Sequence, residues 1–348
     1  MKVFEPKSLL LSLLLINAAT FSLSAQDAQK TYSETYDISK GVTLSTETKY
    51  SDIELLTWEK DVVDIFVEVE VDASSDNKAR EMLEKIEVQI NKSGNTVFLE
   101  TKMDNGWSRN VKVEINITIK APKYINLDME NSYGDLFIQE VSGLVLLDLK
   151  YSNLKAGSLS RGNEKPYNMI DLAYSNAEVD EAGWVEVELS YSDLEINSSR
   201  MLFVESKYSK LIGEKAGGII TKGAYDKYYI DEIDSFVAEL RYSGLKFEVL
   251  NNNLNLHSAY TNAKIFKLSK DFEEVEASLA YGNIYIDVEA GASYKFEGEA
   301  KYGNVNIDSG ERLSKTKENN YVRVWGTVGS SAKSSMKLIT KYGNCTIE

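Results

Sequence analysis

A column of carboxylates is the feature of this sequence best suited to chemistry. Each acid stands three residues before a tyrosine, and the tyrosine is usually followed by Ser or Gly and then by Asp or Asn. The column consists of Glu47, Glu130, Asp148, Asp171, Glu188, Glu205, Glu239 and Glu299, with Lys222, His257 and Ser278 at the same position of other copies. If the copies stack on one another, these side chains form one line on the surface.

Three interpretations of this carboxylate column stay open. Asp171, Glu188 and Glu205 could hold Ca²⁺, which prefers oxygen ligands. A pair of the acids could act as general acid and base on a polysaccharide, as in glycoside hydrolases. The third interpretation is a solvated charged face that keeps the protein soluble. We adopt the third, because no corner sequence supplies the further oxygens that calcium requires, and we predict no metal site.

The sequence lacks the residues that most other kinds of catalysis require. His257 is the only histidine and stands at an outward position of its repeat, which argues against His-based triads and His-rich zinc sites. Cys345 is the only cysteine, so no disulfide can form within the chain. It occupies a position that other copies fill with Leu, Ile or Val, which predicts a buried core residue. The chain has neither a Walker-type phosphate loop nor a GxSxG motif. We therefore predict a non-enzymatic protein with no catalytic residue and no cofactor.

The overall charge narrows the set of partners. The chain carries 39 basic and 54 acidic residues, a net charge of −15. A strongly acidic chain repels nucleic acid and anionic membranes, so we expect neither as a partner. Surface glycans or another envelope protein are the partners that remain.

The elements that position these residues follow from the spacing of the tyrosines. Successive tyrosines are 17 to 23 residues apart, and outlying copies occur at Tyr50 and Tyr342. The regular series is Tyr133, Tyr151, Tyr174, Tyr191, Tyr208, Tyr225, Tyr242, Tyr260, Tyr281 and Tyr302. A short fixed period of this kind is typical of a stacked array of repeats.

Each repeat predicts two strands joined at a corner. Before Tyr191, the apolar residues Val187 and Leu189 share its parity, and after it the parity changes, with Leu194 and Ile196 apolar. Alternate residues of a strand lie on one face, so the change of parity marks a change of direction. Ser, Gly, Asp and Asn suit such a corner, because Gly tolerates positive φ and Asx side chains bond their own backbone. A 17-residue repeat leaves no room for a helix, which indicates a mostly β, single-stranded parallel β-solenoid.

The tyrosine column itself has two interpretations. Tyrosines on adjacent coils would stack as an aromatic ladder that fixes the register of the strands. Alternatively, the rings could form a platform for sugars. We favour the structural ladder, because rings that stack on each other have few free faces.

The beginning of the chain is expected to direct export. Residues 1–25 combine a basic start, a short apolar run and small residues at the exit, which is the pattern of a secretory signal peptide. No later apolar run is long enough to span a membrane. We therefore expect a protein of the periplasm, the cell surface or the surrounding medium, without a transmembrane segment once the signal is removed.

Two further regions follow the signal. Residues 26–130 are expected to hold N-terminal strands and a small α+β unit, an antiparallel meander with one helix at Asp76 to Ile86, which caps the solenoid edge. Residues 131–348 are expected to form the parallel β-helix domain, closed by the corner at Tyr342.

The signal peptide, the Tyr50-Ser51-Asp52-Ile53 corner and its recurrence to Tyr342-Gly343-Asn344 resemble the bacterial putative-adhesin family of exported β-strand-repeat proteins. The resemblance covers residues 40–348. It implies a right-handed β-helix, in agreement with the usual hand of parallel crossovers. It brings no catalytic residues with it.

Together these observations favour a non-enzymatic exported β-solenoid, which acts as an adhesin-like or envelope interaction and scaffold module. The alternative is a carbohydrate-active β-helix enzyme, a polysaccharide hydrolase or lyase.

Overall fold

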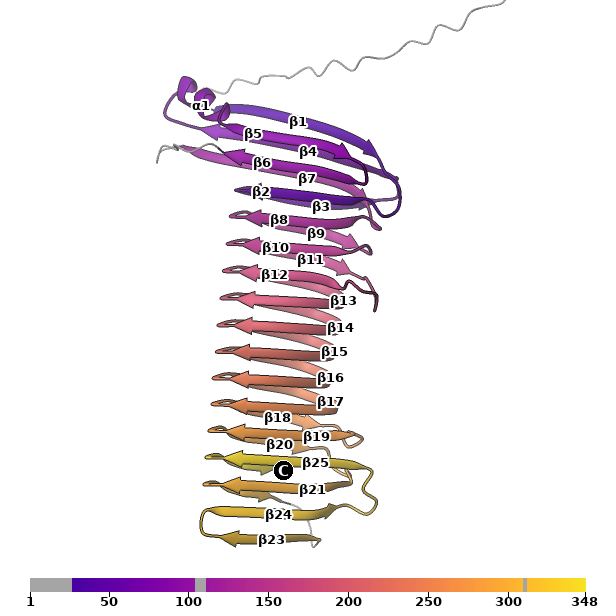
Figure 1. Ribbon diagram of the computed structural model, residues 1–348, viewed down its shortest axis with the longest axis vertical. Coiled ribbons are helices and arrows are strands. Elements are labelled where there is room, and N and C mark those ends of the chain that lie inside the picture. The colour runs from indigo at the N-terminus through magenta and orange to yellow at the C-terminus, as the bar shows by residue number, and fades with distance from the viewer. Residues whose placement is uncertain (1–26, 104–110, 309–311) are drawn as a thin grey trace, which may run out of the picture.

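The computed structural model describes residues 27–103, 111–308 and 312–348. Within these ranges the chain forms 26 strands in one hydrogen-bonded array and one short helix. Consecutive strands wind into a long solenoid with a small α+β unit at its N-terminal end (Figure 1), so the predicted fold class is confirmed. The expected signal peptide, residues 1–25, lies outside the described residues. In the described part of the chain, no helix is long and apolar enough to cross a membrane.

Each coil contributes to two facing sheets, called here the front sheet and the back sheet. Front strands lead into the tyrosine corners, and back strands leave them. In Figure 1 the front strands run to the left and the back strands to the right as the chain descends, so the coil is right-handed. The front strands include β2 (Thr43–Lys49), β8 (Asn126–Ser132), β10 (Val145–Lys150), β12 (Asn168–Ala173) and β19 (Glu274–Ala280). The back strands include β3 (Ser51–Trp58), β9 (Leu136–Val141), β11 (Asn153–Leu159), β18 (Asn262–Leu268) and β20 (Ile284–Val288).

Five long strands in the middle of the solenoid bend from the back sheet into the front sheet. They are β13 (Asn176–Ser190), β14 (Asp193–Lys207), β15 (Lys210–Ala224), β16 (Lys227–Arg241) and β17 (Gly244–Ala259). Each pairs in parallel with the next over nearly its whole length, with equivalent positions of successive coils opposite one another. The coils therefore repeat in register.

The core lies between the two sheets and follows the predicted parity. Val187 and Leu189 on the front sheet and Leu194 and Ile196 on the back sheet are all buried. Cys345 is fully buried in the column that Leu194 also occupies, and burial raises the pKa of its thiol to about 11. The thiol therefore stays protonated and inert at neutral pH.

The backbone of every corner contains a feature that the sequence did not suggest. The repeated tyrosines themselves have positive φ, between 52° and 64° from Tyr50 to Tyr342. The expectation that glycine would supply positive φ at the corner was wrong, because none of the corner glycines adopts it. A left-handed non-glycine residue costs about 1–3 kcal/mol and persists only where its surroundings over-determine it. Here the N–H of each tyrosine bonds to the next coil, as Tyr191 does to the carbonyl of Lys207 at 3.0 Å.

The tyrosine rings stack along the whole length of the solenoid. Successive centroids lie 4.6–5.1 Å apart, and the rings are nearly parallel. About half of each side chain remains exposed. The order of the stack is Tyr50, Tyr133, Tyr151, Tyr174, Tyr191, Tyr208, Tyr225, Tyr242, Tyr260, Tyr281, Tyr342 and Tyr302. Stacking of this kind offsets the backbone cost at each corner.

The residue after each tyrosine points inward and forms a second column. In the middle coils it is a buried Ser, Asp226 or Thr261, whose side-chain oxygen accepts a hydrogen bond from the equivalent backbone N–H of the preceding coil, as Ser192 does from Ser175 at 3.1 Å. In the coils of Gly282, Gly343 and Gly303 there is no side chain, and the carbonyl of the neighbouring corner occupies the space. Two corner types therefore exist, and glycine is required in one of them.

The N-terminal unit extends both sheets. In the back sheet, β1 (Asp27–Asp37), β4 (Val62–Asp72) and β7 (Lys112–Pro122) pair antiparallel, and β7 joins β3 in parallel. In the front sheet, β5 (Ile86–Ser93) and β6 (Thr96–Met103) form a hairpin, and β6 joins β2. Helix α1 (Asp76–Leu83) packs against β1 and β4. The unit is not the sequential meander that was expected, because the chain crosses to the other sheet between β4 and β7.

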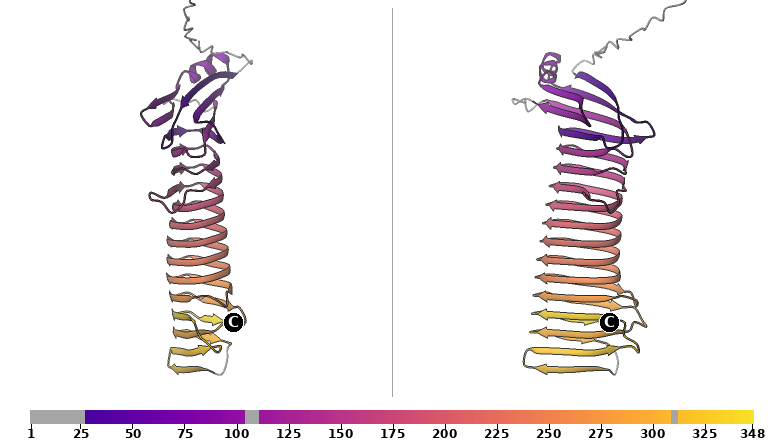
Figure 2. Two further views of the ribbon diagram at one scale, coloured as in Figure 1. Left: turned by 90° about the vertical axis from the view of Figure 1, so that its right-hand side faces the viewer. Right: turned by 45° about the vertical axis from the view of Figure 1, so that its right-hand side comes forward.

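The order of strands changes at the C-terminal end. The elements are β21 (Tyr294–Lys301), β22 (Val305–Ile307), β23 (Leu313–Glu318), β24 (Tyr321–Val328), β25 (Ser334–Lys341) and β26 (Cys345–Ile347). β25 lies between β19 and β21, and β26 lies between β20 and β22 (Figure 2). The last corner, at Tyr342, therefore does not end the solenoid as expected. The hairpin β23–β24 ends the front sheet instead, with the exposed charges of Lys315 and Lys317 on its edge strand.

Candidate functional site

The carboxylate column is longer than its sequence pattern suggested. Cα register pairs join Asp171 to Glu188 and Glu188 to Glu205 on adjacent coils. The same line continues in the other direction, because β2 lies between β6 and β8. Seven acids are thus in register: Glu100, Glu47, Glu130, Asp148, Asp171, Glu188 and Glu205. Sequence spacing could not place Glu100 here, because it precedes no tyrosine corner.

Partial burial and mutual repulsion raise the pKa values of two acids in this column, Asp171 and Glu188. Burial, followed by the charge of Asp148, raises the pKa of the Asp171 carboxyl above its ordinary value. Burial, followed by the charges of Asp171, Glu205 and Glu186, raises the pKa of Glu188. The negative charge of Asp148 is offset by the ammonium of Lys150, whose Nζ lies 2.9 Å from the carboxylate. The stretch at Glu188 is thus the least compensated part of the column.

The proposed calcium ligands do not form a recognisable metal site. Asp171, Glu188 and Glu205 follow one another along one line, and in the described part of the chain no group of three or more His, Cys, Asp or Glu side chains could hold a metal ion. A calcium ion needs six to eight oxygens around it. The arrangement fits a solvated charged face.

Neutralising Glu188 tests this interpretation. The variant Glu188→Gln is expected to melt slightly higher than the wild type in dilute buffer, because adjacent unit charges about 5 Å apart repel by just under ~1 kcal/mol in water. Added NaCl should shrink the gain by screening. Thermal denaturation measures both effects. Glu140→Gln is the matched control, since Glu140 is paired with Lys123 at 2.7 Å and its loss should give no gain.

A specific effect of calcium on the melting temperature would contradict the interpretation as a solvated charged face. If the column bound the ion, millimolar Ca²⁺ would raise the melting temperature of the wild type well beyond NaCl of equal ionic strength, through binding linkage. Glu188→Gln would lose that excess. We expect the two salts to act alike.

A patch of half-buried aromatic rings and exposed aliphatic side chains lies on the same face of the front sheet. Phe203, Ile220 and Val237 are register partners on three consecutive coils, all pointing outward. Ile220 and Val237 are 44% and 42% exposed. The rings of Tyr167 and Trp184 lie beside Phe203, with centroids 5.3 and 5.9 Å from it. These five residues, Tyr167, Trp184, Phe203, Ile220 and Val237, are called the aromatic patch below.

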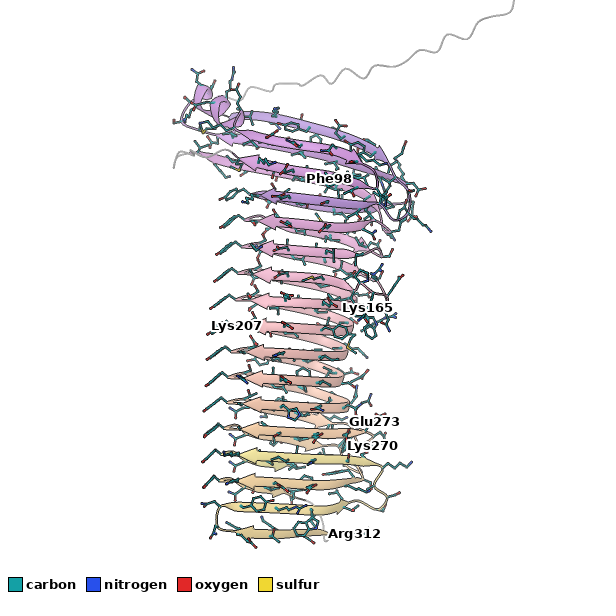
Figure 3. The ribbon with its side chains drawn as sticks, viewed as in Figure 1. Phe98, Lys165, Lys207, Lys270, Glu273 and Arg312 are labelled. Atoms are coloured by element: carbon teal, nitrogen blue, oxygen red, sulfur yellow. The ribbon has the colours of Figure 1, made fainter. Side chains whose placement is uncertain are left out.

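The loop between β11 and β12 borders this patch. It projects from the front sheet (Figure 2) and carries Lys165, which lies at the edge opposite the tyrosine corners (Figure 3). The ammonium of Lys165 lies 5.5 Å from the ring centroid of Tyr167. Hydrogen-bonding groups of Glu186, Glu188 and Asn255 line the same shallow depression. The patch and its border thus combine apolar side chains with carboxylates, an amide and the ammonium groups of Lys165 and Lys222.

Sequence reasoning missed this patch. Its signal was present, because an apolar residue stands five positions before Tyr208, Tyr225 and Tyr242, where outward positions are otherwise mostly polar. Parity alone assigned that position to the exterior and gave no reason to expect a cluster. Tyr167 joins the cluster only through the loop, and Trp184 lies within β13, seven positions before Tyr191, where the corner pattern gives no signal.

A buried polar cluster interrupts the core between two coils. The hydroxyl of Ser206 donates to Asp226 at 3.0 Å, and that of Tyr228 lies 2.7 Å from Ser206. The N–H of Ser209 donates to the other carboxylate oxygen of Asp226 at 2.8 Å. Gly223 leaves the space, since a Cβ there would lie 2.3 Å from the Tyr228 hydroxyl. Every polar group of the cluster has a partner, so the cluster is structural.

The ionisation of the Asp226 carboxyl should make the stability of the protein depend on pH. Burial raises the pKa of Asp226, so the folded state favours the protonated form. The stability that the protonated Asp226 carboxyl contributes is therefore present below the pKa of the unfolded state, about 4. It is lost as pH rises through the pKa of the folded state. Asp226→Asn is expected to raise the melting temperature more at pH 7 than at pH 4. Equal shifts at the two pH values would contradict this, and Asp193→Asn at an exposed corner is the control.

His257 occupies the position in the column that the sequence suggested. It lies between Glu239 and Ser278 as their register partner. It thus belongs to the outer surface of the front sheet, next to the aromatic patch, and it lines the same depression.

Comparison with known proteins gives similarities only among solved structures. No family model matches the chain, and no curated protein matches it. A putative adhesin from Bacteroides fragilis is 13% identical, with a TM-score of 0.30, and the match covers 92% of this chain and 97% of that one. A putative adhesin from Parabacteroides merdae is 8% identical, with a TM-score of 0.31, covering 91% and 96%. A putative cell adhesion protein from Clostridium sporogenes is 11% identical, with a TM-score of 0.16, covering 91% and 99%.

Proposed function

We propose that this chain is an exported, non-enzymatic interaction module with an adhesin-like role, and that it binds its partner through the aromatic patch. The observation that carries the proposal is the exposure of Ile220 and Val237, in line with the half-buried Phe203, on an outer face that is otherwise mostly polar. Exposed apolar clusters with a polar border are typical of binding surfaces.

The chemistry of the patch favours a polysaccharide as the partner. The rings of Tyr167 and Phe203 and the side chains of Ile220 and Val237 offer apolar surface, and the carboxylates and amide beside them can accept and donate hydrogen bonds to hydroxyl groups. The depression is shallow and crosses several coils, which suits a linear chain. The carboxylate column alongside it repels anionic sugars, so the partner is a neutral or amino-sugar polymer.

The arrangement of acids supports binding without turnover. General acid and base catalysis needs two carboxyls whose environments push their pKa values apart. Burial raises the pKa of both Asp171 and Glu188, and they belong to one line of like groups. Turnover of a polysaccharide that a single substitution, Glu188→Gln, abolishes would overturn the non-enzymatic part of the proposal.

Binding to defined polysaccharides tests the proposed surface. In affinity electrophoresis, dextran or chitosan oligomers in the gel should retard the wild type, and anionic hyaluronate should not. Phe203→Ser should lose the retardation. Tyr229→Ser is the matched control, because Tyr229 is an exposed aromatic residue on the back sheet, away from the patch. Equal retardation of the two variants, or none for the wild type, would contradict the proposal.

Export has its own test. Mass spectrometry of the protein from its native host should find a mature N-terminus close to Gln26 in the periplasmic or extracellular fraction. An intact Met1 in those fractions would exclude cleavage of residues 1–25.

A further inference from the structure

The C-terminal segment β25–β26 fills a slot within the solenoid. On the front sheet, Lys337 is the register partner of both Glu276 in β19 and Glu297 in β21. On the back sheet, Cys345 is the partner of both Ile284 and Val305. The segment therefore supplies one complete coil between two coils that precede it in the sequence.

The segment also completes the core and the tyrosine stack. Met336, Leu338, Cys345 and Ile347 are all buried. The ring of Tyr342 lies 4.7 Å from Tyr281 and 4.8 Å from Tyr302. Without the segment, two strand edges and the apolar interior between them would be open to solvent. Such an opening binds any strand that pairs with both edges and places apolar side chains inward.

A short hinge connects the segment to the rest of the chain. The loop of residues 329–333 runs from β24 to β25 and passes over β21, which lies between them. It is held by the N–H of Ser331, which donates to the hydroxyl of Ser293 at 2.9 Å, and by Arg312, whose guanidinium donates to the carbonyl of Gly329 at 3.4 Å. These are exposed, neutral or singly charged contacts, and they can open without disturbing the core.

We propose that the slot is a strand-acceptor site that takes the β25–β26 segment of a second copy of this chain, so that copies associate by exchanging their last coil. β25 and β26 follow all the other described strands in the sequence, so during synthesis both walls of the slot can form before the segment that fills it is available. During that time the identical segment of another copy fits it equally well. Exchange of identical elements through a hinge loop is a low-cost route to dimers, since each copy regains all its contacts.

Split cysteine pairs test the exchange in full-length protein. One copy carries Lys337→Cys and the other Glu297→Cys, both with Cys345→Val, which places in this column the residue found at Val305. The copies are unfolded together, refolded and oxidised. We expect a covalent heterodimer and a peptide that joins positions 337 and 297. A chain carrying both cysteines shows whether the pair closes within one copy, as the register predicts.

The controls use the same outward row. Asn255→Cys lies two strands from β25 and should give several-fold less heterodimer with Lys337→Cys. Glu276→Cys, the partner on β19, gives a second pair that should behave like Glu297→Cys. If the bonds form within one chain but neither heterodimer exceeds the Asn255→Cys level, exchange does not occur and the proposal is wrong.

Shortening the hinge gives an independent measurement. Deletion of residues 330–332 leaves two residues to cross two strand spacings, about 10 Å, which is close to the limit of a fully extended chain. The deletion should shift the protein from monomer to exchanged dimer at the same concentration, as measured by light scattering after gel filtration. An inserted Gly-Ser-Gly-Ser hinge should favour the monomer. A folded deletion variant that stays monomeric would overturn the proposal.

Discussion

Replacing Gly343 by alanine is expected to lower the free energy of unfolding by about 3 kcal/mol. A Cβ at this corner would lie 1.8 Å from the carbonyl oxygen of Gly282, far inside contact distance. The obstacle is backbone of the neighbouring corner, whose strands are hydrogen-bonded on both sides, so it cannot move aside as a side chain would. The coil must therefore shift as a whole or separate.

The matched control is another glycine of the repeated corner. Gly244 follows Ser243, and a Cβ there would meet nothing within 4 Å. Gly244→Ala should be neutral or stabilise by about 0.4–1 kcal/mol through the unfolded state. Chemical denaturation compares the two variants. Because coils contact only their neighbours, hydrogen exchange should locate the damage from Gly343→Ala in β25 and β26 and the strands beside them. Similar costs for the two variants would contradict the close approach at Gly343.

Tyr191 provides the second large effect, and here the choice of replacement matters. Its ring stacks on Tyr174 at 5.0 Å and on Tyr208 at 4.8 Å, and its φ is +52°. Tyr191→Ala loses both stacking contacts, each of which contributes about 0.5–1.5 kcal/mol, and keeps the left-handed backbone. We expect a loss of about 2–3 kcal/mol.

Tyr191→Gly separates the two contributions. Glycine loses the same stacking contacts but adopts positive φ without steric cost. Its loss should therefore be about 1 kcal/mol smaller than that of alanine, although glycine is usually the more destabilising of the two in a strand. Denaturant unfolding of the two variants measures the difference. If glycine were as harmful as alanine, or more so, the ring stack would not be compensating for a strained backbone.

The sequence by itself determined the local pattern of the repeat. The parity change around Tyr191 decides which side chains face inward, because alternate residues of a strand lie on opposite faces whatever the partner strand is. The recurrence of that pattern with a fixed period required a stack of coils. It also placed Asp171, Glu188 and Glu205 on one outer line, since equal repeats in parallel strands bring equal positions together.

Only the tertiary structure decided which coil lies next to which. Every coil presents similar edges. The local sequence therefore does not specify that the coil of Tyr342 lies between those of Tyr281 and Tyr302. The same reasoning applies to Glu100, which enters the carboxylate column through pairing of β6 with β2. Strand pairing is non-local, and its energy depends on which edges remain free once all other strands have paired.

The clustering of the aromatic patch and the positive φ of the repeated tyrosines also could not be predicted from the sequence. Tyr167 reaches Phe203 only because a loop folds over the front sheet, and loop paths depend on contacts rather than periodicity. Positive φ at Tyr191 contradicts the intrinsic preference of tyrosine and is held by neighbours on both sides. Periodicity specifies which face a residue occupies, whereas the cost and the partners of each conformation are determined by the adjacent coils.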